Sequence, residues 1–229
     1  MRPTVLLFDI DGTLLSSGGA GRRAIERAFG ERYGRTDAFA KLSFAGMTDR
    51  AIARAGLTEI GHSSDEREID EALDHYVRVL EEEVARADRY KIHAGMLEAL
   101  DAAFARANTA VGLGTGNIRR GATVKLARVS LHERFAFGGF GCDHEDRAEL
   151  IRVGAQRGAG ALGVPLAECR VVVIGDTPKD VAAAQAIGAE SIAVATGTYK
   201  VEQLMPTGAT WVFPDLAAPG AQAALLGAA

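Results

Sequence analysis

Short apolar runs alternate with helix-like stretches through most of this chain. In the segments between these runs, apolar residues recur at helical spacing, as Leu97, Leu100 and Phe104 do on one face of a predicted helix. Parallel strands buried on both faces read as uninterrupted apolar runs of this kind. The alternation predicts an α/β fold, a doubly wound parallel sheet that binds its ligand at the carboxyl ends of the strands. The candidate strands are Val5–Phe8, Ala110–Leu113, Val171–Ile174, Ile192–Val194 and Trp211–Phe213, with a weaker one near Phe135–Phe140.

One long segment interrupts this alternation. Between Ser16 and Ile92 no run is convincing as a strand, and the patterns are helical. The clearest is Asp65–Arg89, in which apolar residues recur every three or four positions from Ile69 to Val84. We therefore expect residues 16–92 to form a helical insert and residues 1–15 and 93–229 to form the sheet domain.

Composition excludes several classes of protein. The 229 residues carry a net charge of only −4, so neither nucleic acid nor an anionic membrane surface is expected as a partner. Cys142 and Cys169 lack metal-ligand spacing and are expected to be reduced thiols. No signal peptide is evident, and no apolar stretch approaches the roughly 20 residues of a membrane span. A soluble, cytoplasmic protein is expected, while the oligomeric state cannot be read from the sequence.

The first candidate strand ends in two carboxylates. Asp9 and Asp11 follow Val5–Phe8 at positions i and i+2, on the same side of the extended chain, and Gly12 permits a sharp turn after them. Two like charges this close are unfavourable without a nearby cation. An acidic turn at the end of a strand would also explain the pattern, but a cation site explains it better.

Two more carboxylates follow the strand Val171–Ile174. Asp176 lies at the strand end, where no local backbone need explains it, and a hard divalent cation prefers such oxygen ligands. Asp180 is ambiguous, because Thr177, Pro178 and Asp180 also match the start of a helix with a capping box. A structural role and a metal role for Asp180 therefore both stay open.

The strand Ala110–Leu113 leads into Gly114-Thr115-Gly116-Asn117. Small residues around a hydroxyl at a strand end let backbone N–H groups approach an anion. Taken alone, this pattern is also that of an ordinary turn.

Together these motifs resemble the haloacid dehalogenase-like superfamily, which consists mostly of phosphatases, and the likeness covers nearly the whole chain. The segment Asp9–Thr13 resembles the family's first motif, Thr115 its second and Gly175–Asp180 its fourth. The helical insert resembles the family's small α-helical cap, as in phosphoglycolate phosphatase-like members. The resemblance implies a core sheet of order 5-4-1-2-3 with the site roofed by the cap.

The resemblance also implies roles for individual residues. Asp9 would be the nucleophile that forms an aspartyl-phosphate, and Asp11 the general acid and base. Mg²⁺ would be held by Asp9, the Asp11 backbone carbonyl and Asp176, with Asp180 on its water shell. The transferring phosphoryl oxygens would be bound by Thr115, Gly116 and Asn117.

The family's third motif, a lysine ahead of the last-motif strand, is not matched. Arg147 is the nearest cation, at the start of a helix predicted over Arg147–Arg157. Lys125 is the rival for this role and a candidate phosphate contact. It lies about two and a half helical turns beyond Asn117, however, so a solvated helix face is the stronger expectation for it. We assign the third-motif role to Arg147.

In the insert, the segment Gly46–Arg50 is the candidate for contact with substrate, because cap loops of similar phosphatases have that role. Arg50 is the candidate side chain, while Thr48 or Asp49 is a candidate helix cap. Arg22 and Arg23 begin a helix and are expected to be surface charges.

Four alternatives to a phosphatase are weighed. A phosphonoacetaldehyde hydrolase, which uses a Schiff-base lysine of the cap, is disfavoured but stays open, because Lys41 is the only cap lysine before Lys91. Haloalkanoate dehalogenases lack the second aspartate, so Asp11 argues against that reaction. A β-phosphoglucomutase-like phosphoryl transfer stays open because it shares the core chemistry. A non-catalytic binding protein on this fold is disfavoured, because all the carboxylates that the chemistry needs are present. The predicted partner is a small phosphate ester.

Overall fold

A six-stranded parallel sheet forms the body of the protein in a computed structural model that describes residues 2–227. β1 lies in the middle, hydrogen-bonded to β4 on one side and β6 on the other. The strand order is β5-β4-β1-β6-β7-β8, so the order expected for the five core strands is confirmed and β8 extends one edge. All six predicted runs are strands. Their bounds are β1 Thr4–Phe8, β4 Thr109–Thr115, β5 Gly138–Phe140, β6 Arg170–Gly175, β7 Glu190–Val194 and β8 Trp211–Phe213.

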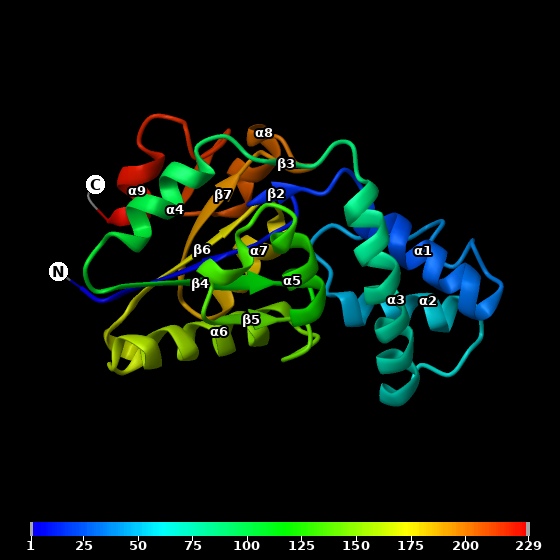
Figure 1. Ribbon diagram of the computed structural model, residues 1–229. Helices are drawn as coiled ribbons and strands as arrows, with labels where there is room; N and C mark the ends of the chain where they lie inside the picture. Colours follow the sequence, from blue (N-terminus) through cyan, green and yellow to red (C-terminus); the bar gives the residue numbers. More distant parts are fainter. Residues whose placement is uncertain (1, 228–229) are drawn as a thin grey trace.

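Helices cover both faces of this sheet, because successive side chains of a strand point to opposite faces. In β1, Leu6 and Phe8 pack on one side with helices α4, α5 and α9. Val5 and Leu7 pack on the other side, mainly against α6, with α7 beside it (Figure 1). The helices are α4 Met96–Phe104, α5 Arg119–Ala127, α6 Arg147–Leu162, α7 Pro178–Ala186, α8 Val201–Leu204 and α9 Ala221–Leu226. Short 3-10 turns lie at His132–Arg134, Leu166–Glu168 and Met205–Thr207.

The helical insert lies between the first two strands of the sheet in chain order. It contains α1 (Ala20–Tyr33), α2 (Asp49–Glu59) and α3 (Glu66–Arg86), and it has an apolar cluster of its own that includes Phe29 and Leu80. We call this insert the cap. Its two ends meet in an antiparallel ribbon of β2 (Leu15–Ser16) and β3 (Lys91–Ile92), which the sequence did not predict because two residues show no periodicity.

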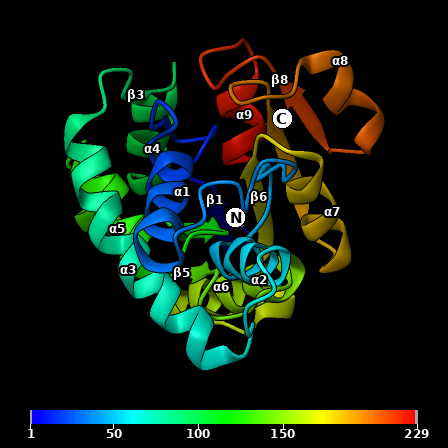
Figure 2. The ribbon, with the colours of Figure 1, turned by 90° about the vertical axis from the view of Figure 1, so that its right-hand side faces the viewer.

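The cap lies over one edge of the sheet domain rather than on either face. In the view from that end, α1, α2 and α3 lie in front of β1 and β6 (Figure 2). Parallel strands direct their carboxyl ends toward the same edge, and the motif residues that follow β1, β4 and β6 therefore lie beneath the cap. Within residues 2–227, no helix combines the length and the apolar character that crossing a membrane requires.

Candidate active site

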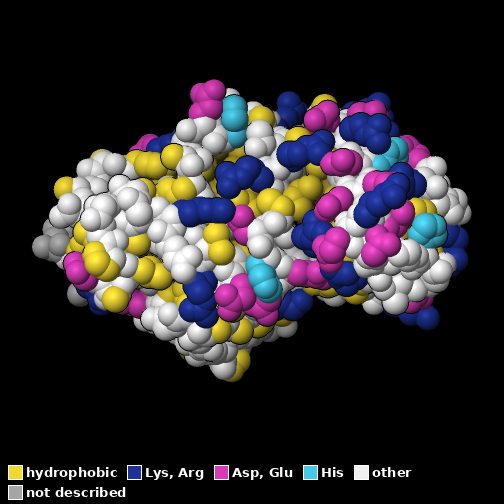
Figure 3. Space-filling model, turned by 90° about the horizontal axis from the view of Figure 1, so that it is seen from below, with side chains coloured by type: hydrophobic (Ala, Val, Ile, Leu, Met, Phe, Trp, Pro, Cys, Tyr) yellow, Lys and Arg dark blue, Asp and Glu magenta, His cyan; other side chains and the backbone are white. Residues whose placement is uncertain are grey.

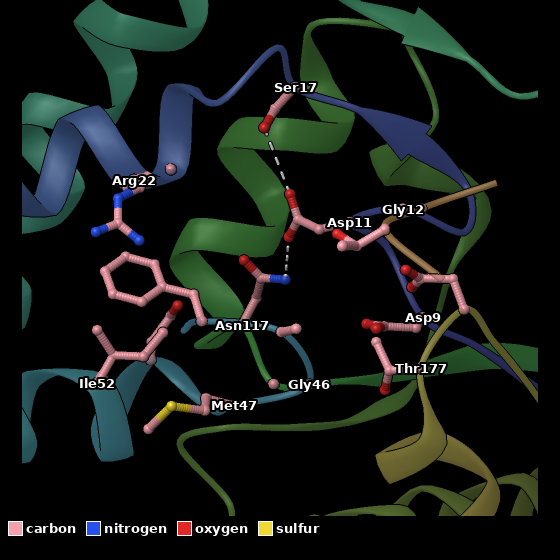
Figure 4. Close-up of a pocket in the computed structure, with 18 of the residues that line it drawn as sticks. Asp9, Asp11, Gly12, Ser17, Arg22, Gly46, Met47, Ile52, Asn117 and Thr177 are labelled. Atoms are coloured by element: carbon pink, nitrogen blue, oxygen red, sulfur yellow. Dashed lines mark hydrogen bonds between the residues drawn. The ribbon is translucent and has the colours of Figure 1, made fainter. Parts of the chain in front are cut away.

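A cavity of about 440 Å³ lies between the carboxyl ends of the strands and the cap. The sheet domain lines it with Asp9, Asp11 and Asn117 among others, and the cap contributes the loop before α2 together with parts of α1 and α3 (Figure 4). Three motifs that are far apart in sequence thus meet at one place.

Asp9 is held at the end of β1 with its carboxylate against Arg147. The residue is 5% exposed, and its backbone N–H donates to the Ile174 carbonyl at 2.9 Å. Oδ1 accepts the Ile10 N–H at 2.8 Å, and Oδ2 accepts Arg147 Nη2 at 2.7 Å. Burial raises the pKa of Asp9 to about 6, although the Arg147 guanidinium acts to lower it.

Arg147 lies at the start of α6, where the sequence placed it. The residue is 8% exposed, and Nε also donates to Asp180 Oδ1 at 2.8 Å. One guanidinium therefore bridges Asp9 and Asp180, a planar fork geometry that a lysine cannot supply. Burial alone would lower the pKa of this guanidinium, but the charges of Asp180 and Asp9 raise it.

Asp9, Asp176 and Asp180 form a buried carboxylate cluster whose ligand atoms lie within 4.8 Å of one another. Thr13 Oγ1 donates to Asp176 Oδ1 at 3.1 Å, whereas no donor in residues 2–227 reaches Asp176 Oδ2. Burial raises the pKa of Asp176 to about 8, and the charges of Asp180 and Asp9 add to this.

Two glycines leave room beside Asp176. A Cβ on Gly12 or on Gly197 would overlap the Asp176 carboxylate, and Gly12 has a φ of 82°, which favours glycine. A hard divalent cation requires oxygen ligands with negative charge, and the clustered carboxylates of Asp9 and Asp176 supply them. The site therefore fits Mg²⁺, with Asp9 and Asp176 as the residues that would hold it.

Asp180 has less capacity left for a metal. Oδ2 accepts both the Thr177 N–H at 3.0 Å and Thr177 Oγ1 at 2.7 Å, which closes a capping box at the start of α7, and Oδ1 accepts Arg147. The structural role considered for Asp180 is thus present, and its place in the carboxylate cluster keeps it near any bound ion.

Asp11 turns its side chain away from that cluster toward a second cation, Lys125. Lys125 Nζ donates to Asp11 Oδ2 and to Asn117 Oδ1, each at 2.6 Å. Asn117 Nδ2 donates to the same Asp11 oxygen at 2.9 Å, and Ser17 lies on the other side (Figure 4). Partial burial acts to raise the pKa of Asp11, but Lys125 and Asn117 hold it below its usual value.

The expectation of a solvated Lys125 is wrong. Lys125 is 4% exposed, and its side chain runs back along α5 to the strand ends, so that the distance of its Cα does not keep its ammonium away. Burial acts to lower the pKa of Lys125, but the neighbouring Asp11 and Asp49 carboxylates raise it.

The turn after β4 carries Thr115, Gly116 and Asn117, the residues that the sequence suggested for anion binding. Thr115 is fully buried, and its Oγ1 accepts Asn117 Nδ2 at 2.8 Å, which leaves the hydroxyl hydrogen free to donate toward Asp9 or a phosphoryl oxygen. The Gly116 carbonyl accepts the Asp49 N–H of the cap at 2.8 Å. A Cβ on Gly116 would overlap the Met47 carbonyl, so this glycine permits the close approach of the cap loop.

The cap loop places Asp49, not Arg50, at the cavity. Arg50 does not line it, because its guanidinium pairs with Glu66 and with Asp70 at 2.6 Å and so joins α2 to α3. The guanidinium predicted to meet substrate thus lies outside the cavity. Thr48 caps α2, because its side-chain oxygen accepts the Ala51 N–H. Of the two candidate caps, Thr48 and Asp49, the first is therefore the one observed. Burial raises the pKa of Asp49 to about 6, although Lys125 acts to lower it.

Arg22 was expected at the surface, but it lines the cavity. Its guanidinium lies over the Phe44 ring, 4.5 Å from the centroid, and donates to the Phe39 and Leu42 carbonyls and to Glu26. Arg23 does remain on the surface, paired with Glu83. The contacts of Arg22 are made by loop segments remote in sequence, which is why no local pattern distinguishes it from its neighbour.

The chain belongs to the haloacid dehalogenase-like hydrolases, since the model of that family matches residues 3–188. It is thus an enzyme of the hydrolase class. No curated protein matches the sequence.

Solved structures share the fold at low identity. CbbY from Rhodobacter sphaeroides, in a variant bound to xylulose 1,5-bisphosphate, has a TM-score of 0.73 at 17% identity, covering 96% of this chain and 97% of that one. A hydrolase from Pseudomonas syringae has a TM-score of 0.68 at 22% identity, covering 93% and 94%. A predicted phosphatase from Clostridium acetobutylicum has a TM-score of 0.64 at 19% identity, with the same coverage.

Proposed function

We propose that this enzyme is a Mg²⁺-dependent phosphomonoesterase that acts through an aspartyl-phosphate on Asp9. The observation that carries the proposal is the different environment of two neighbouring carboxylates. Asp9 faces Arg147 and the carboxylate cluster, whereas Asp11 faces Lys125 and Asn117. One carboxylate is thereby suited to attack phosphorus and the other to handle the proton.

In the first step an Asp9 oxygen attacks phosphorus and the bond from phosphorus to the ester oxygen breaks. Asp11 is ionised in the free site because Lys125 and Asn117 lower its pKa, so it must take up a proton from solvent when the substrate binds, and it gives this proton to the departing alkoxide. In the second step water attacks the aspartyl-phosphate, Asp11 takes a proton from that water, and orthophosphate leaves with Asp9 restored. When bound, Mg²⁺ neutralises charge on the phosphoryl group and on the carboxylates.

The other residues bind and orient. Arg147 lies where it can contact both Asp9 and a phosphoryl oxygen, while the Thr115 hydroxyl and the Gly116 N–H are the proposed donors to the remaining oxygens. Asn117 and Lys125 hold Asp11 in place and are not proposed to bind phosphate directly. The proposal assigns residues 16–92 to the cap and residues 1–15 and 93–229 to the catalytic core.

The first test is hydrolysis of p-nitrophenyl phosphate with and without metal. Activity is expected to vanish in excess EDTA and to return with Mg²⁺, and full activity after chelation would refute the metal dependence.

Asp9→Asn is expected to abolish turnover, because an amide is a poor nucleophile, and the phosphorylated protein should be trapped from wild type but not from Asp9→Asn. Release of orthophosphate, as opposed to an isomerised phosphate ester, separates hydrolysis from a mutase reaction.

A further inference from the structure

Two buried polar side chains at the cap end of the cavity have hydrogen-bonding atoms that no protein group satisfies. Asp49 is 8% exposed and Tyr76 is 2% exposed, and both line the cavity. The Ile118 N–H donates to Asp49 Oδ2 at 2.9 Å. In the part of the chain that the structure describes, neither Asp49 Oδ1 nor Tyr76 Oη has a partner. Both atoms lie on the wall of the cavity with free hydrogen-bonding capacity, which a bound molecule can use.

The charges around these atoms favour a neutral group. Asp49 and Asp11 repel an anion at this end, while the buried Lys125 ammonium, paired with Asp11, offsets much of their attraction for a cation. Arg22 offers little compensation to an anion, because each of its nitrogens already donates to Glu26 or to a backbone carbonyl. A hydroxyl can donate to the carboxylate and accept from the phenol without carrying charge.

The rest of the cap end is apolar. Ile25, Phe44, Met47 and Ile52 line it and can pack against C–H groups of a bound molecule. A cavity of about 440 Å³ has room for a phosphate ester of a six-carbon alcohol.

We propose that Asp49 and Tyr76 bind hydroxyl groups of the leaving alcohol, so that the site selects phosphomonoesters of uncharged polyols over those with a second anionic group. The inference deepens the proposed function by naming the substrate class and the residues that choose it. It rests on the proposed function for the location of the phosphoryl group, but it is tested by binding, without turnover.

The experiment compares three linear six-carbon ligands that share one phosphate: glucitol 6-phosphate, hexyl phosphate and 6-phosphogluconate. Their dissociation constants are measured by calorimetry with Mg²⁺ on the Asp9→Asn protein, which should not turn them over. Glucitol 6-phosphate is expected to bind at least tenfold more tightly than 6-phosphogluconate, because the carboxylate of the latter meets Asp49.

Two further substitutions in the Asp9→Asn protein test the assignment. Asp49→Asn keeps an acceptor for the Ile118 N–H but removes the charge, and it should reduce the preference for glucitol 6-phosphate over 6-phosphogluconate at least tenfold. Tyr76→Phe keeps the ring and should weaken glucitol 6-phosphate severalfold while leaving hexyl phosphate unaffected. Asp70→Asn, an exposed cap carboxylate away from the cavity, is the matched control and should change neither ratio.

The outcomes separate the two proposals. If 6-phosphogluconate binds as tightly as glucitol 6-phosphate, or if both variants keep the ratios of the Asp9→Asn protein, the inference is overturned. If the binding order holds but wild-type protein hydrolyses none of the three ligands with Mg²⁺, the selectivity stands and the proposed hydrolysis fails.

Discussion

At the scale of single residues, each of the two carboxylates proposed to be catalytic is paired with a different cation. Arg147 contacts Asp9, and Lys125 contacts Asp11. Both cations are less than a tenth exposed, so each lies in an environment where its charge is weakly screened. The two substitutions should therefore impair different parts of the reaction.

We expect Arg147→Ala to lower kcat/KM by 100-fold or more, about 2.7 kcal/mol, for every phosphate ester, because it removes a contact at the phosphoryl centre. Lys125→Met keeps the length of the side chain but frees the Asp11 carboxyl. Its loss should be at least tenfold larger for hexyl phosphate than for p-nitrophenyl phosphate, since a poor leaving group depends most on a proton donor held in position, and the lost positioning is expected to outweigh the higher pKa of Asp11 without Lys125. Equal losses on both substrates for Lys125→Met would contradict the separate roles.

The carboxylate cluster predicts a dependence of stability on pH in the absence of metal. Asp176 has a pKa of about 8 in the folded protein, well above its usual value of about 3.9 in an unfolded chain. A raised pKa gives stability that is fully present below pH 4 and is lost as the pH rises through 8. Asp176→Asn avoids this loss and keeps an acceptor for Thr13.

In EDTA, Asp176→Asn should therefore be more stable than wild type. This gain in the free energy of unfolding should grow between pH 5 and pH 8 by on the order of 2 kcal/mol. Urea unfolding at the two pH values measures the difference. A gain that is the same at pH 5 and pH 8 would show that the raised pKa does not contribute.

At the scale of elements, the cap loop before α2 is bound to the core at several points. The Asp49 N–H donates to the Gly116 carbonyl, Asp49 Oδ2 accepts the Ile118 N–H ahead of α5, and Thr48 Oγ1 donates to the Glu145 carbonyl at 3.2 Å. Arg54 of α2 adds an ion pair with Glu145 at 2.9 Å. That pair is partly exposed and stabilises little by itself, so the backbone contacts and the close packing at Gly116 dominate the attachment.

Gly116→Ala should separate the cap loop from the core. The added methyl group would overlap the Met47 carbonyl, a backbone atom that cannot move alone, while the φ of Gly116 suits any residue. We expect kcat/KM for alkyl phosphates to fall at least tenfold, mainly through KM. Gly160→Ala on α6, where a Cβ meets nothing within 4 Å, is the control and should keep full activity while stabilising the protein by about 0.5–1 kcal/mol. Wild-type KM in Gly116→Ala would contradict this role of the glycine.

At the scale of the whole molecule, local patterns predicted the sheet but not the contacts between its two parts. Each strand is an apolar run that can be recognised from its own residues. Asp9, Asp11 and Asp176 are informative because a strand precedes each of them. Lys125, Asp49 and Tyr76 come to the cavity through the long stem of one side chain and through docking of the cap. Neither the reach of a long side chain nor the docking of the cap leaves a periodic pattern in the sequence. Tyr76 in particular matches the apolar face of α3 as well as it matches a cavity residue.

The surface agrees with the modest net charge. On the cap side of the face that Figure 3 shows, basic and acidic side chains alternate and form no single-sign patch. Several charged side chains of the cap are paired between α1 and α3, as Arg27 is with Glu82 at 2.6 Å. The geometry thus concentrates unbalanced charge inside the site, where Asp9, Asp176 and Asp180 face one guanidinium.

Binding of Mg²⁺ should therefore stabilise the folded protein as a whole. A ligand that binds only the folded state adds about 2.7 kcal/mol at a concentration 100 times its Kd, which for a chain of this size raises Tm by roughly 5–10 °C. The pKa values of Asp9 and Asp176 are raised to about 6 and about 8, so protons compete with the ion for these carboxylates. At a fixed, subsaturating Mg²⁺ concentration, the rise in Tm should therefore be larger at pH 8 than at pH 6. Differential scanning calorimetry with Mg²⁺ and with EDTA measures it, and Asp176→Asn should lose most of it. A shift of equal size in wild type and Asp176→Asn would place the ion elsewhere.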